Sequence, residues 1–157
     1  MDPIVLHRGE LKEMKLLQDL FVDTVTNVCS ADYDPHQIAA WTSSVENTDR
    51  WLNIMTIQVV VVAKISDQIV GFSTLGNENY IDLLYVHKDF QGYGIARKLY
   101  QYLEDVAIQN DQTEIFADVS KTALPFFQRM GFGLVREQSV LRYGVELKNY
   151  RMRKLLG

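Results

Sequence analysis

The pattern of apolar positions divides the first part of the chain into a short strand and two helical stretches. We predict a strand over residues 4–7 and a helix over about residues 10–28, where apolar residues recur at three- and four-residue steps. Asp34 and Pro35 open a second helical stretch, with Asp34 as its cap and Pro35 at its first position. This stretch is expected to break near residues 46–48.

The rest of the chain alternates β-branched segments with turns and two more amphipathic helices. Helices are predicted from about residue 93 to 110 and from 122 to 130, with the second stopped at Gly131. The last two strands are predicted to form a hairpin that turns near Tyr143-Gly144. Strands are predicted over residues 58–65, 69–75, 80–86, 114–119, 132–139 and 145–155.

This order of elements predicts the fold class. The succession β, α, α, β, β, β, α, β, α, β, β fits an α/β protein of the α+β type, with a single mixed, mostly antiparallel sheet and helices on both faces. No linker rich in Pro, Gly or Ser divides the 157 residues, so residues 1–157 are expected to form one domain.

Composition excludes several classes of function. The net charge of −4 argues against a nucleic-acid-binding groove, and we interpret the basic segment 151–154 as an exposed strand edge. The chain has no apolar run of membrane-spanning length, so no membrane partner is expected. A single cysteine, Cys29, cannot form an internal disulfide, which favours a cytoplasmic location. The three histidines are scattered without metal-ligand spacing, so no metal is expected.

The most informative segment is the strand 80–86 with the glycine-bearing turn that follows it into a helix. Backbone N–H groups at such a helix start are free, and the helix dipole adds positive charge there, which together make an anion site. Gly92 and Gly94 let the backbone approach a phosphate closely. Arg97 stands where a dinucleotide fingerprint needs glycine, and the Lys-Ser/Thr pair of a nucleotide-triphosphate loop is missing from the sequence. A different phosphorylated cofactor is therefore predicted.

The segment Gln91-x-x-Gly94-x-Ala96 resembles the Gln/Arg-x-x-Gly-x-Gly/Ala signature of the GNAT superfamily of N-acetyltransferases. A second segment, residues 117–132, is similar to the later family signature at Ala123, Gly131 and Phe132. The element order also resembles the GNAT order across nearly the whole chain. The resemblance implies a GNAT-like acyl-CoA N-acyltransferase fold and acetyl-CoA as co-substrate, without a metal.

In the family, two neighbouring strands splay apart and their free backbone groups bind the pantetheine arm of the cofactor, while the glycine turn binds its phosphates. Carried over to this sequence, the resemblance implies a cofactor-binding set of Leu84, Tyr85, Val86, Gln91, Gly92, Tyr93, Gly94, Ile95, Ala96, Ser120 and Phe127.

The sequence departs from the family pattern at two of these positions. Ser120 stands where asparagine is usual, and its hydroxyl can still bond the pantetheine arm. Phe127 replaces the tyrosine that protonates the leaving thiolate in many relatives. Three alternatives follow: another side chain is the donor, water is, or the thiolate leaves unprotonated, which a thiol pKa of about 8.5 tolerates. We expect the neighbouring Phe126 to pack in the core.

Acetyl transfer to an amine requires its neutral form, so a carboxylate must remove a proton directly or through water. The position of the glutamate base in histone-modifying relatives falls here on Tyr80. Glu78 and Asp82 lie two residues to either side, and a regular strand would place all three on one face. Asp82 is the preferred base, because a carboxylate within an apolar strand is costly without a purpose.

The acceptor is expected to be an amine of a small molecule, or less readily of a protein, that attacks the thioester directly. The segment around Tyr33, His36 and Trp41 resembles one in a subgroup of small bacterial acetyltransferases, so these three are candidate acceptor-binding residues. The alternative function is a catalytically silent acyl-CoA-binding sensor or regulatory module. We interpret Cys29 as a buried structural cysteine rather than a nucleophile. A homodimer is compatible with the family.

Overall fold

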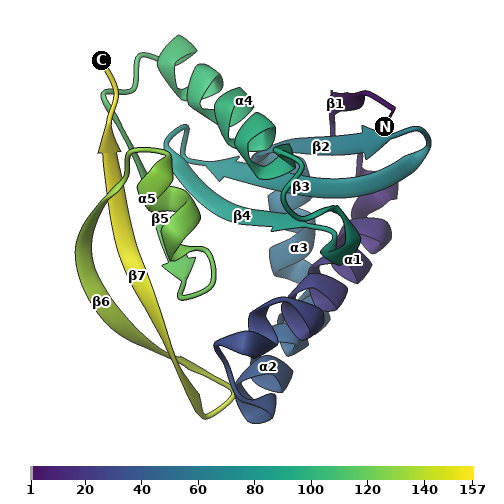
Figure 1. Cartoon of the computed structure of the whole chain (residues 1–157), viewed down its shortest axis with the longest axis vertical. Helices are drawn as coiled ribbons and strands as arrows, with labels where there is room; N and C mark the ends of the chain where they lie inside the picture. The colour runs from purple at the N-terminus through teal and green to yellow at the C-terminus, as the bar shows by residue number, and fades with distance from the viewer. Residues whose placement is uncertain (1) are drawn as a thin grey trace.

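A seven-stranded mixed sheet forms the centre of the computed structural model, which describes residues 2–157 (Figure 1). The strands lie in the order β1-β2-β3-β4-β5-β7-β6, and each neighbouring pair is antiparallel except β4 and β5, which are parallel. The predicted sheet type is therefore confirmed. The bounds are β1 Ile4–Arg8, β2 Val59–Ile65, β3 Gln68–Gly76, β4 Tyr80–Val86, β5 Glu114–Ser120, β6 Gly133–Arg142 and β7 Val145–Leu155.

Helices cover both faces of the sheet, as predicted (Figure 1). One core contains residues of α4 and α5, and the other contains residues of α1, α2 and α3. Strand β2 contributes to both, because Val61 and Ala63 point into the first core and Val60 and Val62 into the second. The helices are α1 Met14–Asn27, α2 Pro35–Thr42, α3 Thr48–Ile57, α4 Ile95–Gln109 and α5 Leu124–Arg129, with short 3₁₀ turns at Leu11–Glu13, Cys29–Ala31, Ser43–Glu46 and Lys88–Phe90.

Local sequence signals place most helix boundaries correctly. Asp34 caps α2 by accepting a hydrogen bond from the N–H of Gln37 at 2.8 Å, with Pro35 at the first helical position. The expected break separates α2 from α3 at the 3₁₀ turn that ends at Glu46. Helix α4 begins at Ile95 rather than near residue 93, because Gly94 has a left-handed backbone with φ 80°.

Strand β7 is not a sheet edge, which corrects the interpretation of the basic segment 151–154. It lies between β5 and β6, so its side chains meet acidic partners on the neighbouring strand. Arg151 lies 3.5 Å from Asp118, and Arg153 lies 3.6 Å from Glu114. Arg151 and Arg153 therefore belong to ion pairs across the sheet, and Lys154 pairs with Glu104 of α4 at 3.0 Å.

Within residues 2–157, no helix combines the length and apolar character needed to cross a membrane. The same residues place no group of three or more His, Cys, Asp or Glu side chains where it could hold a metal ion.

Candidate active site

Strands β4 and β5 separate soon after they begin, which opens the sheet in its middle. Their pairing in the described part of the chain is limited to Tyr80 with Phe116 and Ile81 with Ala117. Beyond these pairs the two strands diverge, as the wide angle between β4 and β5 shows in Figure 1. The remaining length of β4 keeps one neighbour, β3, and its other edge faces the gap.

The free edge of β4 offers backbone donors to this gap. His87, just after β4, donates its N–H to the Val70 carbonyl of β3 at 2.8 Å. Because N–H groups alternate in direction along a strand, those of Leu84 and Val86 point the other way, into the gap. These are the backbone groups that the resemblance implies for the pantetheine arm.

A pocket of about 510 Å³ runs from the gap to the start of α4. It brings together nine of the eleven residues expected to bind the cofactor: Leu84, Tyr85, Val86, Gln91, Gly92, Gly94, Ile95, Ala96 and Ser120. Tyr93 is exposed and does not line it, and Phe127 lines the neighbouring pocket instead. We call this first cavity the cofactor pocket.

The start of α4 is built to receive an anion. Gly92 and Gly94 have φ values of 81° and 80°, and a Cβ on either would project into open space. The first backbone hydrogen bond of the helix runs from the Lys98 N–H to the Gly94 carbonyl at 3.2 Å. The N–H groups of the preceding turn, residues 95–97, therefore lack helical acceptors and remain available to a phosphate.

Side chains complete this anion site in two ways. The Gln91 side-chain amide donates to the Val86 carbonyl at 2.7 Å and so closes the turn, and Gln91 also lines the pocket. Arg97 and Arg129 also line the pocket, and neither forms an ion pair with any residue of the described chain. Both can neutralise phosphate charge. The sequence analysis did not identify either arginine as functional.

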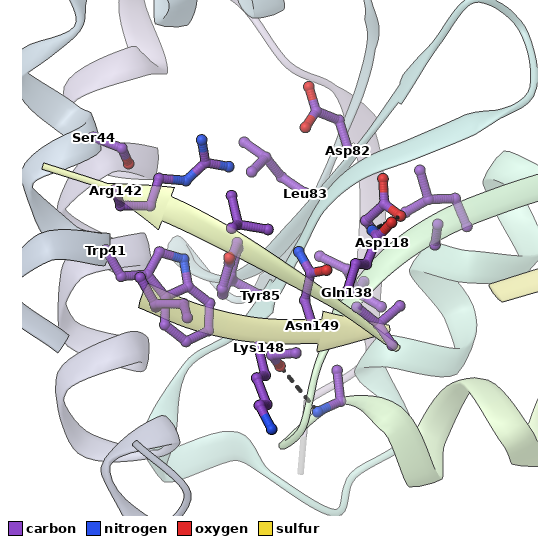
Figure 2. A pocket seen from close by; sticks show the side chains of 18 of the residues that line it. Trp41, Ser44, Asp82, Leu83, Tyr85, Asp118, Gln138, Arg142, Lys148 and Asn149 are labelled. Carbon is purple, nitrogen blue, oxygen red and sulfur yellow. Dashed lines mark hydrogen bonds between the residues drawn. The ribbon is translucent and has the colours of Figure 1, made fainter. Parts of the chain in front are cut away.

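A second pocket, of about 570 Å³, lies on the other side of the gap (Figure 2). It meets the cofactor pocket at four residues common to both walls: Leu84, Tyr85, Ser120 and Ala123. Its walls come from the N-terminal helices, from β4 and β5, and from the β6–β7 hairpin. We call it the acceptor pocket.

The β6–β7 hairpin is tied to the N-terminal helices and so closes one side of the acceptor pocket. Tyr33 donates its hydroxyl to the Lys148 carbonyl at 2.7 Å and accepts from the Lys121 N–H at 2.9 Å. Gln37 donates to the Glu146 carbonyl at 3.0 Å. Tyr33 is thus a lining residue, as expected, and also the link between the hairpin and the start of α2.

Asp82 lines the acceptor pocket at an irregular point of β4. The register shifts there, because Ile81 pairs with Leu75 and Leu83 with Thr74, which leaves Asp82 as the extra residue of a bulge. Its carboxylate accepts hydrogen bonds from Arg50 at 2.8 and 3.3 Å and from Gln58 at 2.8 Å, and is 11% exposed. The Asp82 carboxylate therefore lines the acceptor pocket and is also paired with Arg50 and Gln58. Figure 2 shows Asp82 beside Leu83 at the pocket edge.

Tyr80 also lines the acceptor pocket, where its hydroxyl donates to Asp118 Oδ2 at 2.8 Å. Burial raises the pKa of Tyr80, and the adjacent Asp118 raises it further, so the phenol stays protonated and acts as a donor. Gln138 donates to the other oxygen of Asp118 at 2.7 Å, and Arg151 lies 3.5 Å away. Asp118 is a second pocket carboxylate that the sequence analysis missed.

Two of the candidate catalytic and acceptor-binding residues, Glu78 and His36, line neither pocket. Glu78 has a left-handed backbone, φ 66°, in the loop before β4, and its carboxylate accepts a hydrogen bond from Gln112 at 3.1 Å. Glu78 lies outside the strand, so the prediction that residues 78, 80 and 82 share one strand face is wrong for Glu78. His36 is exposed on α2, away from the pocket wall. Trp41 does line the acceptor pocket, packed edge-on against Tyr33 with ring centroids 5.3 Å apart.

Each of the two adjacent phenylalanines of α5 packs in or against the core and also lines a pocket. Phe127 is 3% exposed and packs edge-on against Phe126 and Phe132. Phe126 is half-buried and packs against the core as expected, and it also lines the cofactor pocket. Cys29 is buried at 5% exposure, as expected, and burial raises the pKa of its thiol to about 11. It is therefore no ready nucleophile.

Comparisons with known proteins agree with this geometry. A family model described as "Acetyltransferase (GNAT) domain" matches residues 29–154. The chain is 34% identical over 153 residues to a protein of Escherichia coli (strain K12) described as uncharacterized N-acetyltransferase YafP, covering 98% of this chain and 97% of that protein.

Solved structures show the same architecture. A GCN5-related N-acetyltransferase from Rhodopseudomonas palustris superposes with a TM-score of 0.95 at 26% identity, covering 99% of this chain and 98% of that one. PaiA N-acetyltransferase from Thermoplasma acidophilum, solved in complex with coenzyme A, superposes with a TM-score of 0.81 at 14% identity, covering 98% and 99%. The sequence match and the pocket geometry lead to one assignment: this chain belongs to the GNAT superfamily and is an N-acetyltransferase.

Proposed function

We propose that this protein transfers the acetyl group of acetyl-CoA to the amine of a small molecule. The observation that carries the proposal is the junction of the two pockets at Leu84, Tyr85, Ser120 and Ala123. An acyl group held in the gap between β4 and β5 would lie at this junction, within reach of an amine in the acceptor pocket.

The residues of the cofactor pocket suit a long, phosphorylated thioester. The free N–H groups at the start of α4, together with Arg97 and Arg129, suit its phosphates. The N–H groups of Leu84 and Val86 suit its pantetheine amides and can polarise the acyl carbonyl. When bound, acetyl-CoA supplies the activated acyl group.

A small acceptor is favoured over a protein because the β6–β7 hairpin covers one side of the acceptor pocket. The hydrogen bonds of Tyr33 and Gln37 hold the hairpin against the N-terminal helices. A polypeptide acceptor would have to enter past this closed side. A small amine fits within a cavity of about 570 Å³ without displacing the hairpin.

The reaction needs a proton acceptor, because an alkylamine with a pKa of about 10.4 is mostly charged at neutral pH. We assign this role to Asp82, acting through a water molecule, with Asp118 as the rival carboxylate on the opposite strand. The carboxylate first takes one proton from the ammonium through the water molecule, so that the neutral nitrogen can form a bond to the acyl carbon. The carbon–sulfur bond then breaks, and the second proton that the nitrogen loses passes to solvent water. Phe127 has no proton to give, and of the three alternatives we assign departure of the sulfur as a thiolate, which a thiol pKa of about 8.5 tolerates.

Release of free thiol from acetyl-CoA, measured over a panel of small amines, tests the proposal. Binding of acetyl-CoA should be measured in parallel by calorimetry. Turnover with a small amine supports the proposal. Binding without turnover on any amine supports the silent acyl-CoA-binding module instead, and absence of acetyl-CoA binding contradicts both.

A further inference from the structure

Two polar side chains that line the acceptor pocket, the partly buried Asn149 and the exposed Arg142, have unused hydrogen-bonding capacity within residues 2–157. Asn149 Oδ1 is buried and accepts no hydrogen bond from this part of the chain. The guanidinium of Arg142 has no ion-pair or hydrogen-bond partner there, and Figure 2 shows it directed across the pocket toward Leu83. The other lining cations, Arg50 and Lys148, have carboxylates within 2.8 and 3.8 Å.

These two side chains lie at opposite ends of the acceptor pocket. Asn149 pairs with Ser120 across β5 and β7, and Ser120 is one of the residues where the two pockets meet. Asn149 therefore marks the end near the cofactor. Across β6 and β7, Asn149 pairs with Gln138. Arg142 is four residues further along β6, which is roughly 13 Å nearer the hairpin tip.

The chemistry of the two ends defines a complementary ligand. A buried carbonyl oxygen without a partner requires an N–H donor, and an acceptor amine supplies one beside the junction. An unpaired guanidinium favours a carboxylate, which it binds through two parallel hydrogen bonds. Between the ends, the pocket wall includes the apolar side chains of Leu83, Val140 and Leu147, which suit a methylene chain.

We propose that the acceptor is an amine that carries a carboxylate at its far end, with the amine beside Asn149 and the carboxylate on Arg142. This inference rests on the proposed acetyl transfer to a small amine. The separation of the two ends favours ω-amino carboxylates over α-amino acids, in which the two groups are one carbon apart.

Calorimetry in the presence of coenzyme A tests the inference directly. The ligands are ω-amino carboxylates of increasing length, each compared with its own carboxamide. Wild-type protein is expected to bind a carboxylate of matching length about tenfold or more tightly than the carboxamide. Arg142→Gln should abolish this preference, and Arg142→Lys should restore part of it. Arg153→Gln is the matched control, because Arg153 is on the same hairpin but lines neither pocket.

Two substitutions of Asn149 test amine binding at the other end of the acceptor pocket. Asn149→Asp keeps an acceptor oxygen and should retain amine binding, whereas Asn149→Leu should weaken carboxylate and carboxamide alike. Equal affinity of the wild type for both ligands, or an unchanged preference in Arg142→Gln, would overturn the inference. Thiol release with amines that lack a carboxylate, at rates equal to the best ω-amino carboxylate, would also overturn it and leave acetyl transfer intact. A retained carboxylate preference without thiol release would support the binding site and contradict the proposed transfer.

Discussion

Arg50 on α3 holds Asp82 on β4 through both carboxylate oxygens, at 2.8 and 3.3 Å. The pair connects an N-terminal helix to the bulged strand that borders the acceptor pocket. Gln58 adds a third hydrogen bond at 2.8 Å. The carboxylate that the sequence suggests as a base is thus also a structural link, and the two roles can be separated by substitution.

The variant Asp82→Asn separates the role of Asp82 as a base from its role as a structural link. If Asp82 takes the proton of the amine, kcat falls by about a hundredfold or more, because an amide cannot accept it. The free energy of unfolding should fall by no more than in the Arg50 variant described next, since the amide oxygen of asparagine can still accept the bonds of Arg50 and Gln58 that now go to Oδ2, although its NH2 group cannot accept the bond at Oδ1. Arg50→Gln is the companion variant and is expected to destabilise by about 1–2 kcal/mol, limited by the partial exposure of the arginine. Steady-state kinetics and urea unfolding measure the two effects. Unchanged kcat in Asp82→Asn would leave Asp118 as the candidate base.

Gly94→Ala tests the phosphate site at the start of α4. A non-glycine residue at φ 80° costs about 1–2 kcal/mol, and the new Cβ projects into the space of the cofactor pocket. We expect coenzyme A affinity to fall about tenfold or more, measured by calorimetry. Gly144→Ala is the matched control, because Gly144 has φ 78°, also faces open space and lies at the far hairpin turn. Equal losses of affinity in both variants would contradict a specific role for Gly94.

The sequence was most informative where a functional feature depends on residues that are adjacent in the chain. The phosphate turn at residues 91–96 and the helix start at Asp34 are local, since capping and left-handed glycines follow from a few adjacent positions. The separation of β4 from β5 was predicted from the family resemblance, because periodicity alone indicates only an ordinary strand.

The acceptor pocket could not be assembled in this way. Asp118 and Asn149 line the same pocket because the last strand inserts between β5 and β6, and that order has no local signal. Arg50 reaches Asp82 only through the packing of α3 beside the sheet. A carboxylate within an otherwise apolar strand is the signal that could have identified Asp118, as it identified Asp82. Glu78 failed for a local reason, its left-handed backbone, which is uncommon for a residue other than glycine.

Tyr33→Phe tests the closure of the acceptor pocket. The variant removes one hydroxyl and leaves the Lys148 carbonyl and the Lys121 N–H without their partner. We expect a loss of about 1–3 kcal/mol in the free energy of unfolding, measured by urea denaturation. A loosened hairpin should also raise KM for the acceptor while coenzyme A affinity stays constant. Trp41→Phe is a useful comparison, since Trp41 lines the same pocket but makes no bond to the hairpin backbone within the described residues. A rise in KM without any loss of stability would place Tyr33 in direct contact with the acceptor instead.

Cys29 provides a test of burial that depends on pH. Burial raises the pKa of its thiol from an ordinary 9.0 to about 11, so the native protein holds the neutral form more strongly than the unfolded chain does. Its stabilising effect is complete below pH 9 and is lost as pH rises toward 11, when the unfolded thiol ionises first. The free energy of unfolding should therefore fall by about 2–3 kcal/mol more in the wild type than in Cys29→Ala over this interval.

Iodoacetamide at pH 8 should modify the Cys29 thiol slowly in the native protein and rapidly in urea. Coenzyme A should slow the native reaction further, since Cys29 borders the cofactor pocket. Equal alkylation rates in the native and unfolded protein would show that the thiol is accessible and reactive, contrary to its burial.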